Sequence, residues 1–155
     1  MKKFQFSLGR MRDYRERLLE EEKGTLQRYK AERNQIEDEI ARLEGEFGEL
    51  SRRMQEKAEK GTTVIELRKL SAQMDNVRMQ IRELEKALTK AEQRVEKQMQ
   101  VVVEANKEVT KLDKLEEKQL EEYRRQVNKA EEDRIDEFVS QALPGAARLN
   151  GVLVS

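Results

Sequence analysis

Two heptad tracts on either side of a short break constrain the fold of this chain more than any other feature. Before the break, apolar residues follow one another at alternating steps of four and three: Ile36, Ile40, Leu43, Phe47, Leu50 and Met54. After it, the same spacing links Leu67, Leu70, Met74, Val77, Ile81, Leu84, Leu88, Ala91 and Val95. An average period of about 3.5 residues keeps one narrow apolar row, which we call the seam, facing a partner helix. Because the chain has a seam on each side of one break, it can supply its own partner.

The break at Lys60-Gly61-Thr62-Thr63 therefore predicts an all-α fold, a single antiparallel two-helix coiled-coil hairpin over residues 1–142. We expect the first helix over about residues 4–58, the turn over about residues 59–63 and the second helix over about residues 64–142. Pro144, followed by Gly145, ends the helical pattern. Residues 143–155 carry no period and are expected to form a flexible tail.

Toward the N-terminus, the seam of the first helix is expected to continue with one slip between Leu18 and Leu26, which would locally change the supercoil. Its further members are Leu8, Met11, Leu18, Leu26 and Tyr29. A turn centred on Gly61 places Phe47 opposite Met74 and Val77. The same register places the basic residues Lys2, Lys3, Arg10, Arg12, Arg15 and Arg17 beside the acidic residues Glu104, Glu108, Asp113, Glu116, Glu117 and Glu121. Such pairs select the orientation of the helices more than they add stability.

The second helix is expected to extend beyond the first by roughly twenty residues, or ~30 Å at about 1.5 Å per residue. The apolar residues of this extension are Tyr123, Val127, Ile135, Phe138 and Leu143. Apolar side chains on an unpaired helix mark a surface for a partner or for a second copy of the chain. Two alternatives stay open, that the first residues of the chain cover them or that the helix end frays. The run from Met99 to Val103 is likewise either a lateral contact patch or ordinary exposed surface.

Composition excludes several function classes. The chain has 155 residues, of which 41% are charged and 36% hydrophobic, and its net charge is zero. A neutral chain lacks the cationic excess that phosphate binding needs, so we expect no nucleic-acid partner. It contains no cysteine, histidine or tryptophan, which removes thiolate and imidazole metal ligands and every catalytic triad built on histidine. We therefore expect no cofactor, no metal site and no enzymatic activity.

The longest purely apolar run is Val101-Val102-Val103, far short of the ~20 residues that a membrane span requires. The basic start at Lys2-Lys3 is not followed by an apolar stretch, so it is not read as a signal peptide. We expect a soluble chain without direct membrane insertion.

The two ends of the chain carry its most specific patterns. The first reads Phe4-x-Phe6-x-Leu8-x-x-Met11-x-x-Tyr14-Arg15-Glu16. The second reads Leu112-Asp113-Lys114-Leu115-Glu116-Glu117-Lys118-Gln119-Leu120-Glu121-Glu122-Tyr123-Arg124, with a later Ile135-Asp136-Glu137-Phe138. Together they resemble the opening and the C-terminal helix of the flagellar export protein FliJ, and the resemblance covers about residues 2–140.

The resemblance implies a two-helix stalk, similar to that of the rotary ATPase gamma subunit, in the central pore of the hexameric flagellar export ATPase. It further implies that the stalk promotes assembly and activity of the ring, contacts the FlhA export gate and escorts export chaperones, in support of flagellum assembly and motility. The implied location is the cytoplasm, peripherally at the inner membrane through the export apparatus. An equivalent stalk of a virulence injectisome and a structural coiled-coil tether are the alternative readings.

Carried over to this sequence, the ATPase-facing candidates lie at the terminal end of the hairpin: Phe4, Phe6, Leu8, Tyr14, Leu120, Tyr123 and Phe138. The export-gate-facing candidates lie near the turn: Phe47, Leu50, Met54, Leu67, Leu70 and Met74. These residues also follow the predicted seams, so packing between the two helices is the alternative role.

Overall fold

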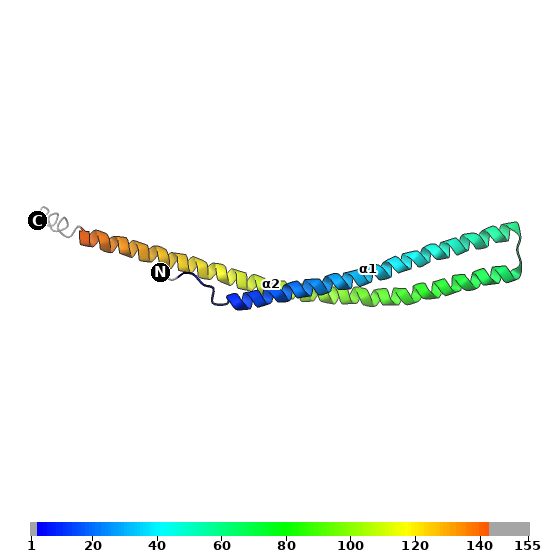
Figure 1. Ribbon diagram of the computed structural model, residues 1–155, viewed down its shortest axis with the longest axis horizontal. Helices are drawn as coiled ribbons and strands as arrows, with labels where there is room; N and C mark the ends of the chain where they lie inside the picture. Colours follow the sequence, from blue (N-terminus) through cyan, green and yellow to red (C-terminus); the bar gives the residue numbers. More distant parts are fainter. Residues whose placement is uncertain (1–2, 143–155) are drawn as a thin grey trace, which may run out of the picture. The chain divides into compact units, whose positions relative to one another are not determined.

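The structure is a computed structural model that describes residues 3–142 of the chain. Within this range it contains two α-helices, α1 (Gly9–Lys60) and α2 (Val64–Ala142), and no strand. The helices pack against each other as an antiparallel pair on either side of a short turn (Figure 1). The predicted fold class, an all-α helical hairpin, is confirmed.

The chain divides into two compact units, which we describe separately. The terminal unit comprises residues 3–16 and 107–142 of the described range, and the hairpin unit comprises residues 17–106. The hairpin unit contains the turn, and the terminal unit contains both ends of the described chain.

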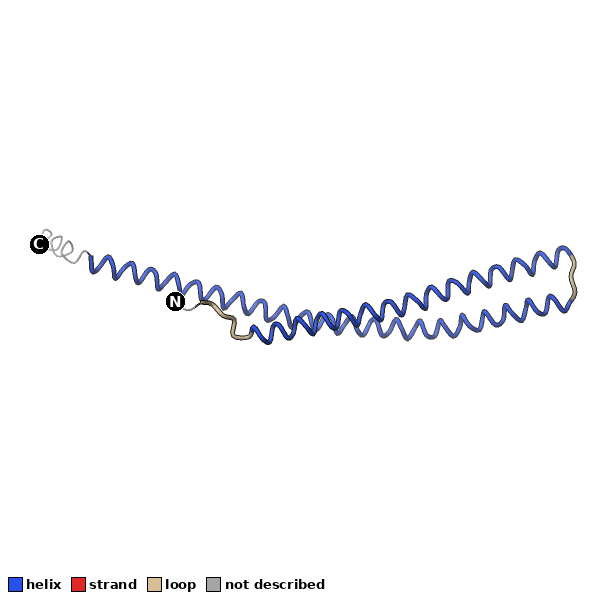
Figure 2. Tube along the Cα trace, in the orientation of Figure 1, coloured by secondary structure: helices blue, strands red, loops and turns tan. Residues whose placement is uncertain are grey.

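Helix α1 begins five residues later than the sequence predicts, at Gly9 instead of Phe4. Figure 2 shows the preceding residues as a loop. The Gly9 amide donates to the Phe6 carbonyl over 3.1 Å, and the Arg12 amide donates to the Leu8 carbonyl over 2.9 Å. The apolar residues Phe4, Phe6 and Leu8 alternate at every second position, a spacing that belongs to an extended segment and not to a helix. Helix α1 ends at Lys60, and α2 has the predicted bounds.

Residues at the turn specify where α1 ends and where α2 begins. Gly61 has a φ of 87°, in the left-handed region that glycine adopts without a steric penalty and that commonly follows a helix end. Thr63 caps α2, since its Oγ1 accepts a hydrogen bond of 3.3 Å from the Glu66 amide. The Thr62 hydroxyl donates to the Glu66 carboxylate over 2.6 Å. This bond, and after it the Lys57 ammonium, lower the pKa of Glu66. The turn is thus specified by residues within it.

The two predicted seams form the core of the hairpin unit. Leu43 is the most buried side chain, at 2% exposure, and it clusters with Leu50, Leu70 and Val77. Half-buried apolar residues pack around this cluster: Phe47, Met54, Met74, Ile81 and Leu84. Further along the pair, the buried residues are Leu19, Leu26 and Ile40 of α1 and Ala91 and Val95 of α2. The heptad spacing therefore identified the side chains that hold the two helices together.

Pairs of side chains across the two helices agree with the predicted register. The guanidinium of Arg78 lies 5.1 Å from the ring centroid of Phe47, directly beside the expected partner Val77. The guanidinium of Arg94 lies 4.1 Å from the ring centroid of Tyr29 and 3.2 Å from the Glu32 carboxylate. Both arginines cover the edge of the seam, where the aromatic face attracts the cation.

The slip that the sequence predicts between Leu18 and Leu26 is wrong. Leu19 is buried and Leu18 only half-buried, and inward-facing residues of α1 continue the alternation of four and three without interruption. The positions concerned are Arg12, Arg15, Leu19, Glu22, Leu26, Tyr29 and Arg33 of α1, and Leu8 precedes them at the same spacing. Met11, expected in the seam, is instead 49% exposed. Polar residues occupy several of the true seam positions. The apolar pattern therefore assigned the seam to neighbouring residues instead.

At one of these polar seam positions, Glu22, the side chain and the backbone accept hydrogen bonds from a residue of α2. Gln98 is 8% exposed and is the only buried polar residue among those the structure describes. Its side-chain amide donates to the carbonyl of Glu22 over 3.0 Å and also to the Glu22 carboxylate. A satisfied polar layer within an apolar seam favours one register over shifted ones, at some cost in stability.

Candidate functional site

The N-terminal arm, which we define as residues 3–8, lies against α2 in the terminal unit (Figure 1). The Phe4 ring packs on Tyr123 with centroids 5.5 Å apart and a tilt of 48°. The Phe6 ring lies under the guanidinium of Arg12, at 5.7 Å, and Arg12 forms an ion pair with Glu116. The last contact supports the predicted pairing of basic and acidic stretches.

This arrangement corrects the expectation that Tyr123 faces solvent. Tyr123 is half-buried because the arm turns back over α2 and places Phe4 on it. The sequence had left this open as the alternative in which the first residues cover the extension. An arm that is not helical can reach further along α2 than a helix of the same number of residues, since an extended residue advances about 3.3 Å and a helical one about 1.5 Å.

The remaining ATPase-facing candidates divide into packed and exposed residues. Phe6, Leu8 and Leu120 are half-buried, whereas Tyr14 and Phe138 are exposed. The structure thus brings Phe4 and Tyr123 into contact, and it places Phe138 on a part of α2 where every described side chain is exposed.

The end of α2 carries an exposed apolar strip, which we define as Ile135, Phe138 and Val139. Ile135 is 60% exposed and Phe138 is 70% exposed. Phe138 and Val139 lie three and four residues after Ile135, so the three residues share one face of the helix. Val139 is absent from the candidates that the sequence provided, although its helical spacing from Ile135 would have indicated it. Leu143, which was also expected on this extension, lies outside the described residues.

The export-gate candidates near the turn are mainly core residues. Leu50 and Leu70 are buried, and Phe47, Met54 and Met74 pack against the same core, while Leu67 is half-buried. The exposed apolar residues of this region are different ones, namely Val64, Ile65 and Met79. The heptad period detects inward-facing residues, so it could not distinguish these surface positions.

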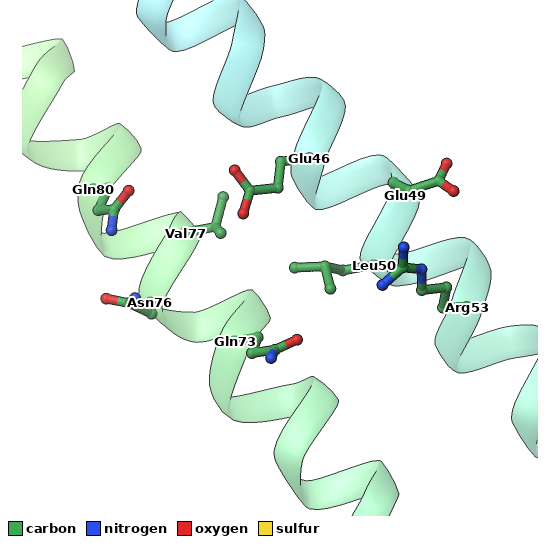
Figure 3. Close-up of a pocket in the computed structure, with 8 residues that line it drawn as sticks. All are labelled: Glu46, Glu49, Leu50, Arg53, Gln73, Asn76, Val77 and Gln80. Carbon is green, nitrogen blue, oxygen red and sulfur yellow. The ribbon is translucent and has the colours of Figure 1, made fainter.

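Two grooves of about 400 Å³ each lie between the helices of the hairpin unit. Figure 3 shows Leu50 and Val77 projecting from opposite helices into the space of the first groove, with polar side chains around them. Its lining is completed by Glu46, Glu49, Arg53, Gln73, Asn76 and Gln80. The second groove is lined by Glu39, Leu43, Met79, Gln80, Glu83 and Leu84.

Two of the carboxylates that line these grooves, Glu49 and Glu39, are hydrogen-bonded to arginine side chains. A hydrogen bond from Arg52 lowers the pKa of Glu49, and one from Arg42 lowers the pKa of Glu39. A carboxyl group with a lowered pKa stays ionised and is a poor proton donor near neutral pH. Glu39 and Glu49 are therefore held in the ionised form.

Residues 3–142 contain no group of three or more acidic, histidine or cysteine side chains placed to hold a metal ion. No helix in that part of the chain is long and apolar enough to cross a membrane. At the lateral run, Met99, Val101 and Val103 are exposed and Val102 is half-buried, so a contact patch there stays a prediction.

Phe4→Ala should release the arm while leaving the hairpin folded. The loss of one ring contact at a half-buried site is expected to cost about 1 kcal/mol of unfolding free energy. The Tyr123 ring resonances in an NMR spectrum should move toward their solvent-exposed positions. Phe6→Ala is the matched control, because Phe6 contacts Arg12 and its loss should shift Tyr123 less. Unchanged Tyr123 resonances in Phe4→Ala would contradict the packing of the arm.

Comparison with known proteins identifies one matching family. The model of the family described as Flagellar FliJ protein matches residues 4–148, which is most of the chain and includes both terminal patterns. Searches of curated proteins and of solved structures gave no match. The match supports a component of flagellar type III protein export. This chain belongs to the flagellar FliJ protein family.

Proposed function

We propose that this chain is the stalk of the hexameric flagellar export ATPase, and that its terminal unit sits in the central pore of the ring and promotes ring assembly and ATP hydrolysis. The observation that carries this proposal is the exposed apolar strip, above all Phe138 at 70% exposure. Large apolar side chains exposed together on one helix face mark a protein-binding surface, and aromatic residues contribute strongly to binding.

The arm adds a second element to the same unit. Phe4 and Tyr123 form a half-buried aromatic pair on α2, and Arg12, Phe6 and Glu116 hold the arm beside it. A surface built from two chain segments is more rigid than a single helix, which reduces the ordering cost of binding. The candidate residues Phe4, Phe6 and Tyr123 contribute to ring binding through this shape.

The end of the hairpin unit that carries the turn is proposed for the FlhA export gate and for export chaperones. Its exposed apolar residues are Val64, Ile65 and Met79, and Met79 also lines the second groove. Methionine adapts to surfaces of different shape, which suits a site that receives more than one partner. Bound in this way, the chain would be cytoplasmic and peripheral at the inner membrane through the export apparatus.

The test compares two pairs of exposed residues in binding to the purified hexameric flagellar export ATPase of the same bacterium. Ile135→Ala/Phe138→Ala should melt within about 1 kcal/mol of the wild type, as surface variants usually do. It should nevertheless lose about 2 kcal/mol or more of ring binding, which is about 30-fold in affinity, together with stimulation of ATP hydrolysis.

Val64→Ala/Ile65→Ala is the control at the turn, where the two side chains are similarly exposed. It should keep ring binding and stimulation. If the turn variant loses stimulation and the strip variant keeps it, the turn faces the ATPase and the proposed orientation is wrong. The tether alternative predicts instead that the wild type sediments as a dimer and that the strip variant sediments as a monomer.

A further inference from the structure

We infer that the end of α2 docks into an apolar socket whose rim carries arginine or lysine side chains. This inference rests on the proposed function and names the chemistry of the partner surface that receives the apolar strip. It is carried by two acidic residues, Glu131 and Glu132, which accompany the strip on the same helix face.

The geometry follows from the helix. Glu131 and Glu132 lie four and three residues before Ile135, so they occupy the turn next to the strip and point to the same side. Every side chain from residue 128 to residue 142 is exposed. A partner surface that covers Ile135 and Phe138 therefore also covers, or closely borders, these two carboxylates.

The carboxylates have no partner within the part of the chain that the structure describes. Neither Glu131 nor Glu132 forms an ion pair or hydrogen bond among residues 3–142, although Lys129 and Arg134 are close in sequence. The last turn of α2 contains no basic residue. Over residues 129–142, five acidic residues (Glu131, Glu132, Asp133, Asp136, Glu137) stand against two basic ones (Lys129, Arg134), a net charge of −3.

Burial of the strip favours a cationic rim on the partner surface. Water around the strip leaves when Phe138 and Ile135 enter an apolar surface, and the neighbouring carboxylates lose part of their hydration. An ionised carboxylate that is dehydrated without a partner opposes binding strongly. Arginine offsets this loss best, because its guanidinium can bind a carboxylate with two parallel hydrogen bonds.

Glu131→Lys/Glu132→Lys tests the inference in the full chain. Wild-type binding to the purified hexameric export ATPase should weaken as salt rises, because the charge pairs are screened. The variant should bind about tenfold more weakly at low salt, and its affinity should depend much less on salt. Its circular dichroism and melting temperature should match those of the wild type.

Asp133→Lys/Glu137→Lys is the matched control. These residues lie two positions before and two after Ile135, and two helical steps turn the chain by about 200°, so both point away from the strip. The control makes the same change in net charge on the same segment. It should keep wild-type affinity within about twofold and keep the wild-type salt dependence.

Each other outcome overturns the inference in a distinct way. Equal losses in both variants would mean that only the overall charge attracts the ring. Full binding by Glu131→Lys/Glu132→Lys would mean that the socket has no basic rim, while the proposed function would stand. A wild type that does not bind the ring removes the proposed function and this inference with it. Dimerisation through the strip would identify a second copy as its occupant.

Discussion

Leu43→Glu should lower the free energy of unfolding by about 4 kcal/mol, the largest effect expected of a single side-chain change in the seam. Leu43 is 2% exposed and lies at the centre of the cluster formed with Leu50, Leu70 and Val77. The substitution removes the buried leucine and places a carboxylate among apolar side chains. Glutamate forms helices nearly as well as leucine, so the intrinsic stability of α1 is not the cause. Urea unfolding followed by circular dichroism measures the change.

Two further glutamate variants calibrate this result. Met79→Glu introduces the same charge at a position that is 64% exposed, and it should change stability by less than about 0.5 kcal/mol. Leu84→Glu should fall between the two, because Leu84 is half-buried beside the same cluster. If Leu43→Glu unfolded at the same urea concentration as Met79→Glu, the position of the core would be wrong.

Ala91→Pro should lower the free energy of unfolding by about 3 kcal/mol or more. Ala91 is buried in the interior of α2, where proline removes a backbone hydrogen bond and clashes with the preceding turn. The kink would also separate the two seams around this position. A lower helical signal in circular dichroism and a lower melting temperature are the expected readouts.

Val64→Pro is the control for this substitution. Val64 is the first residue of α2, and proline is well tolerated at this position because the amide there has no partner within the helix. The preceding Thr63 caps the helix and so already has the extended backbone that a following proline requires. Stability should change by less than about 1 kcal/mol. Equal effects of the two prolines would contradict an uninterrupted α2.

The fold was predictable from sequence because the period of the seam is a local signal repeated many times. Leu43, Leu50, Leu70 and Val77 all follow the heptad, and all are buried. The same signal failed where polar residues such as Arg12 and Glu22 occupy seam positions, because apolar neighbours then imitate a shifted pattern. Thr63 and Glu66 have the Thr-x-x-Glu spacing of a capping box, which predicts the start of α2 from sequence.

The candidate site was less predictable. The family resemblance identified the two terminal segments, but the contact between Phe4 and Tyr123 joins residues that are far apart in the sequence, and no local pattern reports such a contact. Near the turn, apolar residues were selected by their heptad spacing, which indicates burial. The exposed side chains Ile65 and Met79 do not follow this spacing and were therefore not predicted as candidates. Surface positions require knowledge of which helix face the partner helix leaves open.

The hairpin connection also orders the events of folding. The pair Lys57 and Glu66, at the turn, is separated by 9 residues, whereas Glu22 and Gln98 are separated by 76 and Arg12 and Glu116 by 104. Between the first and the last of these separations, the entropy cost of closing the loop rises by about 2 kcal/mol. Contacts near the turn should therefore form early, and those of the terminal unit late.

During synthesis, this order has a consequence for the arm. Residues 3–8 are made before α2, but Phe4 cannot contact Tyr123 until most of α2 has been made. Terminal segments are also among the parts of a folded protein that open most readily. The arm is thus made before α2 and packed late, and we expect it to detach and return while the rest of the hairpin stays folded.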